Sequence, residues 1–162
     1  MGALSASCFG QRIIILRPQR AMEAAEQAQH VLHVIPSIDD ASDPLPLRGN
    51  GVAFAGVSTT LGDAVAAATE SWAVKHSAAR AGGWELKVAL IQSRAEVSGG
   101  RITVELAARV TLTATVGQVY LAQTHGYCKQ TDVFTEDPTG TVYRCMESMA
   151  HDLAGWLEGV QP

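Results

Sequence analysis

Two cysteines and two histidines in the last third of the chain have side chains that could do chemistry. They are His125, Cys128, Cys145 and His151. Zinc accepts such ligands, and a cysteine beside a histidine and an acid such as Asp152 could act as a nucleophile. The spacing is unlike that of a compact zinc knuckle, because His151 lies six residues beyond Cys145. A small metal-binding protein or thiol enzyme is therefore kept as an alternative function. Our first interpretation of the chain is a non-catalytic protein, with no catalytic residue, metal site or cofactor.

The same two cysteines also allow a structural interpretation. Cys128 falls at the end of an expected strand, and Cys145 falls in the helix that follows after a short loop. The pair could form a disulfide, which would leave Cys8 as the remaining cysteine. Two buried free thiols, packed as small hydrophobic side chains, are the alternative. We favour a disulfide between Cys128 and Cys145.

The segment 51–58 has the glycine spacing of a phosphate-binding loop. Val57 occupies the position at which such a loop needs its lysine. The apolar residues between the glycines indicate a strand instead. The segment therefore predicts no nucleotide site.

Composition narrows the class of protein. The length of 162 residues fits one domain. Hydrophobic residues make up 47% and charged residues 17%, which indicates a globular chain rather than a disordered one. The net charge is −4 and the twelve basic residues are scattered, which argues against nucleic-acid binding. No apolar run approaches the roughly 20 residues of a membrane span.

The N-terminus resembles the end of a secretory signal. Residues 1–8 (MGALSASC) are small and mostly apolar and end at Cys8, as in a bacterial lipoprotein signal, although Leu4 stands four residues before the cysteine rather than three. We take Cys8 as a candidate for lipidation, with a frayed ordinary terminus as the alternative. Residues 1–18 are predicted to be a flexible N-terminal segment or signal remnant, and residues 19–162 a single domain.

Hydrophobic periodicity predicts the elements that must position these residues. Residues 19–29 favour a peripheral helix, 31–36 and 52–57 short strands, and 37–50 an irregular loop. Thr60 and Asp63 have the form of a capping box, which predicts a helix from Thr60 to about Arg80. Tryptophans 72, 84 and 156 are expected to be core anchors.

The strongest pattern begins at Trp84. Apolar and polar residues alternate along 84–90 and 102–114, and residues 118–128 are predicted to form a third strand, with turns at Gly99-Gly100 and at Gly117. A final amphipathic helix begins at Asp137-Pro138, with Asp137 as its cap. The predicted fold class is α+β, a two-layer sandwich in which two amphipathic helices cover one face of an antiparallel sheet.

The order of elements from about Val52 onward resembles that of the periplasmic auxiliary lipoproteins. These comprise the accessory component of some ABC-type transporters, the penicillin-binding-protein activators and the N-terminal domain of the Tol-system propeller protein. The shared scheme is a strand, a helix, a long antiparallel meander and a last helix ending in a pair such as Trp156-Leu157. The resemblance implies a non-catalytic accessory protein, in the periplasm or anchored to the outer membrane, that binds another envelope protein.

The polar side of the strand from Arg101 to Thr113 is the candidate contact surface for that partner, represented by Thr103, Glu105, Arg109 and Thr111. We expect a protein partner, no nucleic acid, and membrane contact only through a lipid anchor; an oligomer is left open. A structural subunit of a larger assembly is a further alternative function, and the cytoplasm is the alternative location.

Overall fold

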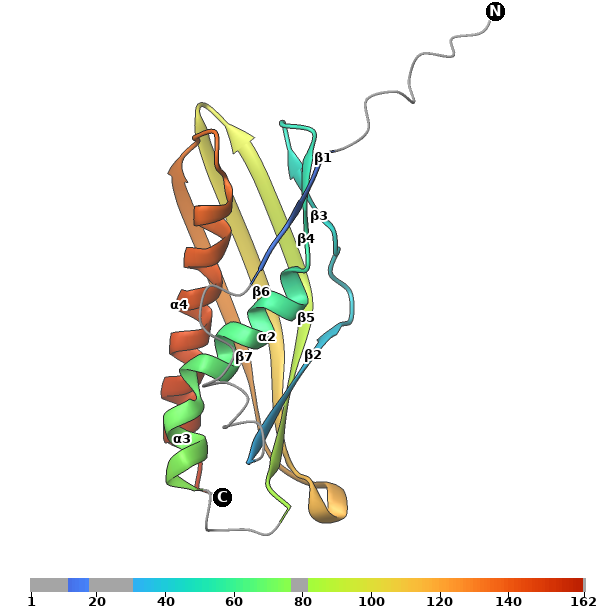
Figure 1. The fold of residues 1–162 in the computed structure, drawn as a ribbon, viewed down its shortest axis with the longest axis vertical. Coiled ribbons are helices and arrows are strands. Elements are labelled where there is room, and N and C mark those ends of the chain that lie inside the picture. Colours follow the sequence, from blue (N-terminus) through green and yellow to red (C-terminus); the bar gives the residue numbers. More distant parts are fainter. Residues whose placement is uncertain (1–11, 18–30, 77–81, 162) are drawn as a thin grey trace, which may run out of the picture.

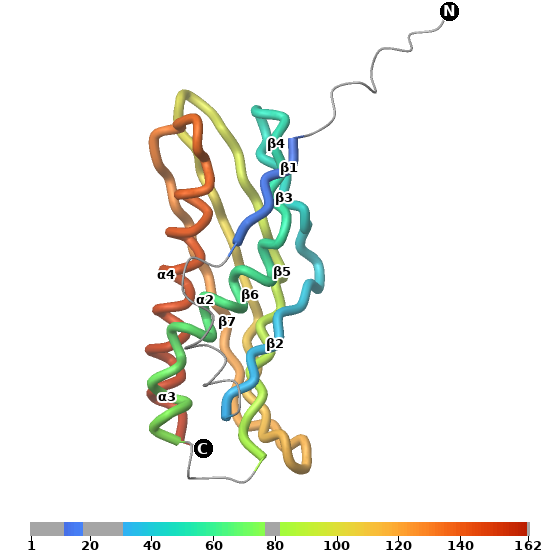
Figure 2. The backbone as a smooth tube through the Cα atoms, in the orientation of Figure 1, coloured from blue at the N-terminus to red at the C-terminus, as the bar shows by residue number. Residues whose placement is uncertain are grey.

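A large sheet forms the framework of the protein, and helices lie against one of its faces (Figures 1 and 2). The computed structural model describes residues 12–17, 31–76 and 82–161. Within them the strands and helices are β1 (Arg12–Ile15), β2 (Leu32–Ile38), β3 (Leu45–Arg48), β4 (Val52–Ala55), α2 (Val57–Ala68), α3 (Glu70–Lys75), β5 (Trp84–Ser98), β6 (Arg101–Ala114), β7 (Val119–Val133) and α4 (Thr139–Glu158). The expected helix at 19–29 lies outside the described residues.

The sheet is mixed, so the expectation of a purely antiparallel sheet is wrong. Its strand order is β1-β4-β3-β5-β6-β7, and β2 also pairs with β5. The β1–β4, β2–β5 and β3–β5 pairs are parallel, whereas β3–β4, β5–β6 and β6–β7 are antiparallel. Parallel neighbours need a crossover connection, and the stretch containing α2 and α3 provides one between β2 and β5.

Strands β5, β6 and β7 form the predicted meander. Gly99 and Gly100 make the turn between β5 and β6 with φ values of 59° and 73°, which the mirror-image turns of tight hairpins require. Gly117, with φ of 81°, lies in the second turn. Alternate residues of β6 are fully buried on the helix side, from Ile102 to Ala114. The period-two pattern therefore predicted both the strands and the side that faces the core.

The helical segment after β4 differs from the prediction in two ways. It begins at Val57 rather than at Thr60, and Gly56 precedes it with φ of 81°. It also breaks into α2 and α3 at Thr69, whose hydroxyl donates to the Val65 carbonyl at 2.7 Å. Such a bond competes with the helical ladder and favours a bend. The predicted capping box is thus wrong, because Thr60 lies within the first turn.

A residue of segment 37–50, which was expected to be an irregular loop, stabilises the start of α2. The Asp43 carboxylate accepts the Gly56 amide at 2.9 Å and the Ser58 amide at 3.3 Å. A carboxylate at a helix N-terminus satisfies free amides and complements the helix dipole. The same stretch, 37–50, also contains β3, which pairs with both β4 and β5. The prediction missed β3 because Pro44, Pro46 and Gly49 indicate a loop.

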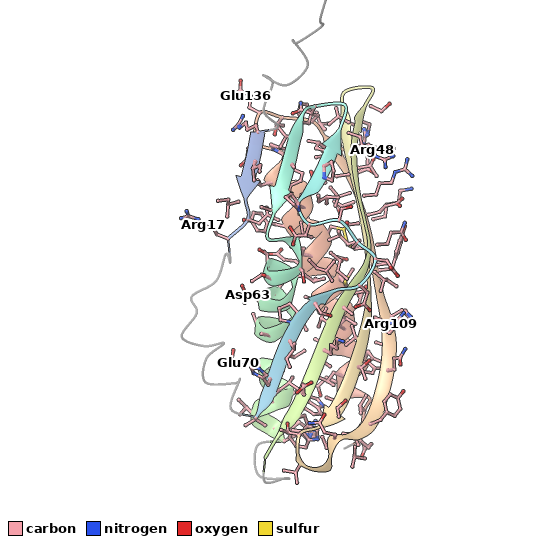
Figure 3. The ribbon with its side chains drawn as sticks, turned by 90° about the vertical axis from the view of Figure 1, so that its right-hand side faces the viewer. Arg17, Arg48, Asp63, Glu70, Arg109 and Glu136 are labelled. Carbon is pink, nitrogen blue, oxygen red and sulfur yellow. A yellow bond between two sulfur atoms is a disulfide. The ribbon has the colours of Figure 1, made fainter. Side chains whose placement is uncertain are left out.

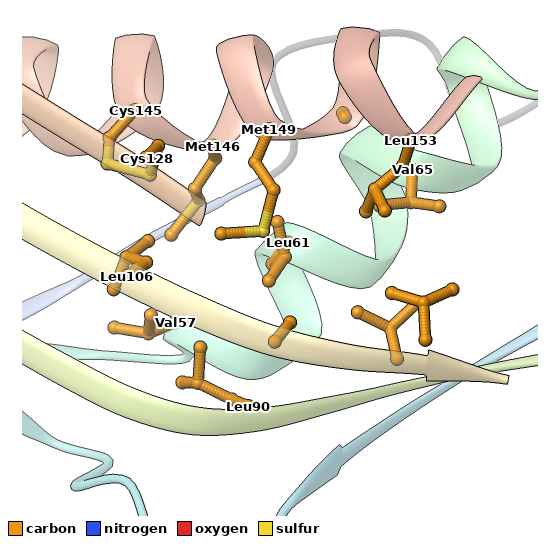
Figure 4. Close-up of a cluster of buried hydrophobic side chains, with 14 of the residues drawn as sticks. Val57, Leu61, Val65, Leu90, Leu106, Cys128, Cys145, Met146, Met149 and Leu153 are labelled. Atoms are coloured by element: carbon orange, nitrogen blue, oxygen red, sulfur yellow. A yellow bond between two sulfur atoms is a disulfide. The ribbon is translucent and has the colours of Figure 1, made fainter. Parts of the chain in front are cut away.

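Helix α4 covers the inner side of β6 and β7 (Figure 4). Asp137 lies just before it and accepts the Thr139 amide at 3.1 Å, and the Thr139 side-chain and backbone hydrogen bonds lower the pKa of Asp137 below its ordinary value. One side of α4 is fully buried, through Val142, Cys145, Met146, Met149, Leu153 and Leu157. The helix approaches β7 closely at Gly126, where an added Cβ would lie 2.9 Å from the Met149 Cγ and 3.4 Å from a Leu153 methyl.

Two tryptophans anchor the other end of the core. Trp72 and Trp84 are both 1% exposed and meet edge to face, with ring centroids 5.2 Å apart. This arrangement suits the quadrupoles of aromatic rings. Trp156, expected to be a third anchor, is only partly buried.

We predict that Gly126→Val destabilises the protein by about 1–3 kcal/mol, because the branched side chain would overlap Met149 in a closely packed core. Urea unfolding measures the change. Gly155→Ala is the matched control in the overlying helix: its Cβ would meet nothing within 4 Å, so stability should hold or rise by up to about 1 kcal/mol. Met149→Ala should offset part of the Gly126→Val loss, and additive losses would contradict the proposed contact.

Candidate functional site

The four residues predicted as a contact surface share the side of β6 that faces away from the helices. In Figure 3 the labelled Arg109, which belongs to this side of β6, projects to the right of the strands, away from the helices. Thr103, Glu105 and Thr111 are half-buried and Arg109 is exposed. Their common orientation follows from the alternation of side chains along a strand.

Thr103 and Glu105 belong to a shallow depression of about 260 Å³. Strand register sets its walls, because Glu96, Thr103 and Thr131 form one row across β5, β6 and β7, and Arg94, Glu105 and Lys129 form the next.

Hydrogen bonds and ion pairs connect the residues of these rows. The hydroxyls of Thr103 and Thr131 are 3.0 Å apart, and the Lys129 ammonium lies 3.2 Å from Glu105. Arg94 pairs with Glu96 along β5 at 3.1 Å. Within the depression each charge therefore has an opposite charge as its neighbour.

Arg109 and Thr111 lie outside the depression. Arg109 is six residues from Thr103 along β6, which corresponds to about 20 Å, and it contacts Asp39 at 3.4 Å. Thr111 stands between Lys87 and Gln123 in its own row. The structure thus places all four residues on one face but brings only Thr103 and Glu105 together.

The face is suited to contact with another polar surface. Its ion pairs lie at the surface, each with an exposed basic partner, and surface pairs contribute only about 0–1 kcal/mol each to folding. A partner could replace them with its own charges at little cost, while opposite charges guide its register. The chemistry available here is therefore recognition, through hydroxyls and charges of both signs.

Four further residues of the depression were not predicted: Arg94, Glu96, Lys129 and Thr131. The signal that could have found them is alternation, since each occupies an outward position of a flanking strand. Assigning them to the same rows as Thr103 and Glu105 requires the register between strands, which the sequence alone does not supply.

The structure contains the predicted disulfide and does not assemble the alternative Cys/His site. Cys128 and Cys145 are bonded, with Cα atoms 5.4 Å apart, and join β7 to α4. His125 is exposed whereas Cys128, three positions along the strand, is buried, so the two side chains lie on opposite faces of β7. His151 is exposed on α4. Within the described residues no group of three or more His, Cys, Asp or Glu could hold a metal ion.

Cys8, the candidate for lipidation, lies outside the described residues. No helix in the described part of the chain is both long and apolar enough to cross a membrane.

No family model matches the sequence, and the comparison with curated proteins found no match. Solved structures do share the fold. A Xanthomonas campestris protein of family DUF330 is 15% identical over 89% of this chain and 93% of its own, with a TM-score of 0.53. A protein described only as uncharacterized is 13% identical over 91% and 97%, with a TM-score of 0.54. At these identities the likeness shows the fold alone.

A Caulobacter crescentus protein described as a candidate lipoprotein is also similar. It is 12% identical over 86% of this chain and 99% of its own, with a TM-score of 0.44. That score is too low to support an argument.

We predict that removing the disulfide costs about 3 kcal/mol, because the bond closes a loop with a sequence separation of 17 and so restricts the unfolded chain. Urea unfolding of the oxidised protein and of a Cys128→Ala/Cys145→Ala variant measures the loss. Reductant should lower the stability of the first protein and leave the second unchanged. Equal stability of the two proteins would show that the bond does not constrain the chain.

Proposed function

We propose that the protein is a non-catalytic accessory protein of the bacterial cell envelope. In this proposal it is held at a membrane by lipid on Cys8, in the periplasm or at the outer membrane. It binds another envelope protein through the outward face of β5, β6 and β7. The observation that carries the proposal is the Cys128–Cys145 disulfide.

The disulfide supports an envelope location because such bonds persist in oxidising compartments and are rare in the cytosol. Both cysteines are almost fully buried, with exposures of 5% for Cys128 and 0% for Cys145. The bond joins two core elements rather than surface loops, which favours a structural role over a transient redox one.

The outward face supports binding because it extends over three strands of 14 or 15 residues and most of its described positions are exposed or half-buried. Asp39, which follows β2, contacts Arg109 of this face from outside the three strands. Partner-binding surfaces often combine apolar contacts with a polar rim. Here Tyr127, 56% exposed, lies in the row next to Glu105 and provides an aromatic group beside the charged depression.

The location is tested by the state of the three cysteines in protein from its native host. Alkylation without reduction, followed by peptide mass mapping, should show lipid on Cys8 and a link between Cys128 and Cys145. A Cys8→Ser variant should move from the membrane fraction to the soluble fraction. Three free thiols, or a wild-type protein that is already soluble after cell fractionation, would count against the envelope proposal.

The binding face is tested by photo-crosslinking in cells. A photoreactive amino acid at Glu105 or Arg109 should give the same crosslinked partner, because the two positions share one face. Glu147, exposed on α4 on the opposite side of the sheet, is the control and should not give that product. Identical products from all three positions, or crosslinks from Glu147 alone, would place the contact elsewhere.

A further inference from the structure

We propose that the free edge of β7 pairs with the same edge of a second copy of this chain, antiparallel and centred on Tyr127. This contact uses the backbone edge of β7, whereas the proposed function uses the outward face, and Tyr127 belongs to both. Dimerisation is read on the purified chain and partner binding in cells, so either proposal can fail without the other. Among the described strands β7 has one neighbour, β6. Helix α4 packs against β7 and β6 and lies behind the strands in Figure 3.

One hydrogen bond shows which backbone groups of β7 face β6 and which face away from the sheet. The Phe134 amide donates to the Gly100 carbonyl at 2.9 Å, directly after the Arg101–Val133 pair. Hydrogen-bonded and non-bonded pairs alternate in an antiparallel ladder. Even-numbered residues from Ala122 to Asp132 therefore bond to β6. Odd-numbered residues from Gln123 to Val133 direct their amides and carbonyls away from the sheet.

Strand β7 has a bulge near its start, where Thr113 faces Tyr120 but Leu112 faces Ala122. From Ala122 to Val133 the edge lacks the features that usually block pairing. Exposed edges are commonly protected by short length, proline, bulges or free lysines. The strands on the other side of β5 show such features, since β2 contains Pro36 and β3 contains Pro46 in only four residues. By contrast β7 has 15 residues, no proline and a single lysine, whose ammonium Glu105 holds at 3.2 Å.

A second copy suits the side chains along the edge. A two-fold axis at Tyr127 sets this residue against its own copy, which gives a favourable aromatic cross-strand pair. The same axis sets Lys129 opposite His125 and Thr131 opposite Gln123. Lys129 is the one Lys, Arg, Asp or Glu among Gln123, His125, Tyr127, Lys129 and Thr131, so no two such side chains face each other in this row.

The flank of α4 beyond β7 is self-complementary about the same axis. Ser148 lies level with Tyr127, because Cys145 is bonded to Cys128 and strands rise about twice as far per residue as helices. Arg144 and Asp152 stand four residues on either side of Ser148, and all three are exposed. A two-fold axis therefore brings Arg144 of each copy to Asp152 of the other.

The expected distance between the α4 helices of the two copies also allows them to pack. Helix α4 packs on both β6 and β7, and we place its axis over these two strands. With neighbouring strands about 4.8 Å apart, the two α4 helices come to roughly 10 Å, a normal helix packing distance. Arg144 already holds Asp132, whose pKa it lowers, and its exposed guanidinium keeps further donors for the second carboxylate.

Sedimentation equilibrium tests the proposal with the purified wild-type chain. We expect a dimer. Tyr127→Lys should yield a monomer, because two ammonium groups would meet at the axis. Gln92→Lys is the matched control: it lies in the same row as Tyr127, on β5, two strands from the edge, and should remain a dimer. A wild-type monomer at all concentrations, or a Tyr127→Lys dimer of unchanged affinity, would overturn the proposal.

The helix contact has its own test. Asp152→Arg sets two arginines against each other and should raise the dimer dissociation constant about tenfold or more, whereas Glu147→Arg on the outer side of α4 should not. Amide hydrogen exchange adds a residue-level readout. Odd-numbered amides from Gln123 to Thr131 should be protected in the wild type and exchange faster in Tyr127→Lys, while even-numbered ones stay protected in both. Fast exchange of the odd-numbered amides in the wild type would rule out strand pairing.

Discussion

The burial of one side of β6 is the constraint on which the rest of the structure depends. From Ile102 to Ala114 every second residue is almost completely excluded from water, which fixes the strand against a one-residue slip, because a slip would expose the whole set. Hydrogen-bonded pairing then sets the orientation of β5 and β7, because paired residues on neighbouring strands place their side chains on the same face of the sheet. The core, the polar face and the position of α4 are therefore consequences of a single alternation.

Close contact between α4 and β7 completes the core. Gly126 allows the helix to approach, and the disulfide one turn earlier along α4 holds it there. The contact also fixes which flank of α4 lies beside the sheet edge. Residues far apart in sequence, such as Arg144 and Asp132, are thereby brought into an ion pair.

Local patterns predicted the elements whose signals are contained within a short segment. The meander, its glycine turns, the last helix and the disulfide were all found this way. The exposed side of β6 was also identified, but its partners on β5 and β7 were not, because register depends on contacts between strands.

Long-range contacts explain the remaining errors. The parallel pairing of β1, β2 and β3 cannot be read from their own residues. The start of α2 depends on Asp43, which lies 13 residues before Gly56, and its break depends on a hydroxyl that bonds back to the preceding turn.

The position of the disulfide within the chain has a consequence for biosynthesis. Cys145 lies in α4, which follows every described strand in the chain, so the two cysteines cannot meet until those strands have been made. Oxidation is thus a late event, and it secures the last helix onto a sheet whose earlier strands are already complete. A truncated product lacking α4 could not acquire the bond. It would expose the apolar inner side of β6 and β7, a surface that quality-control proteases and chaperones recognise.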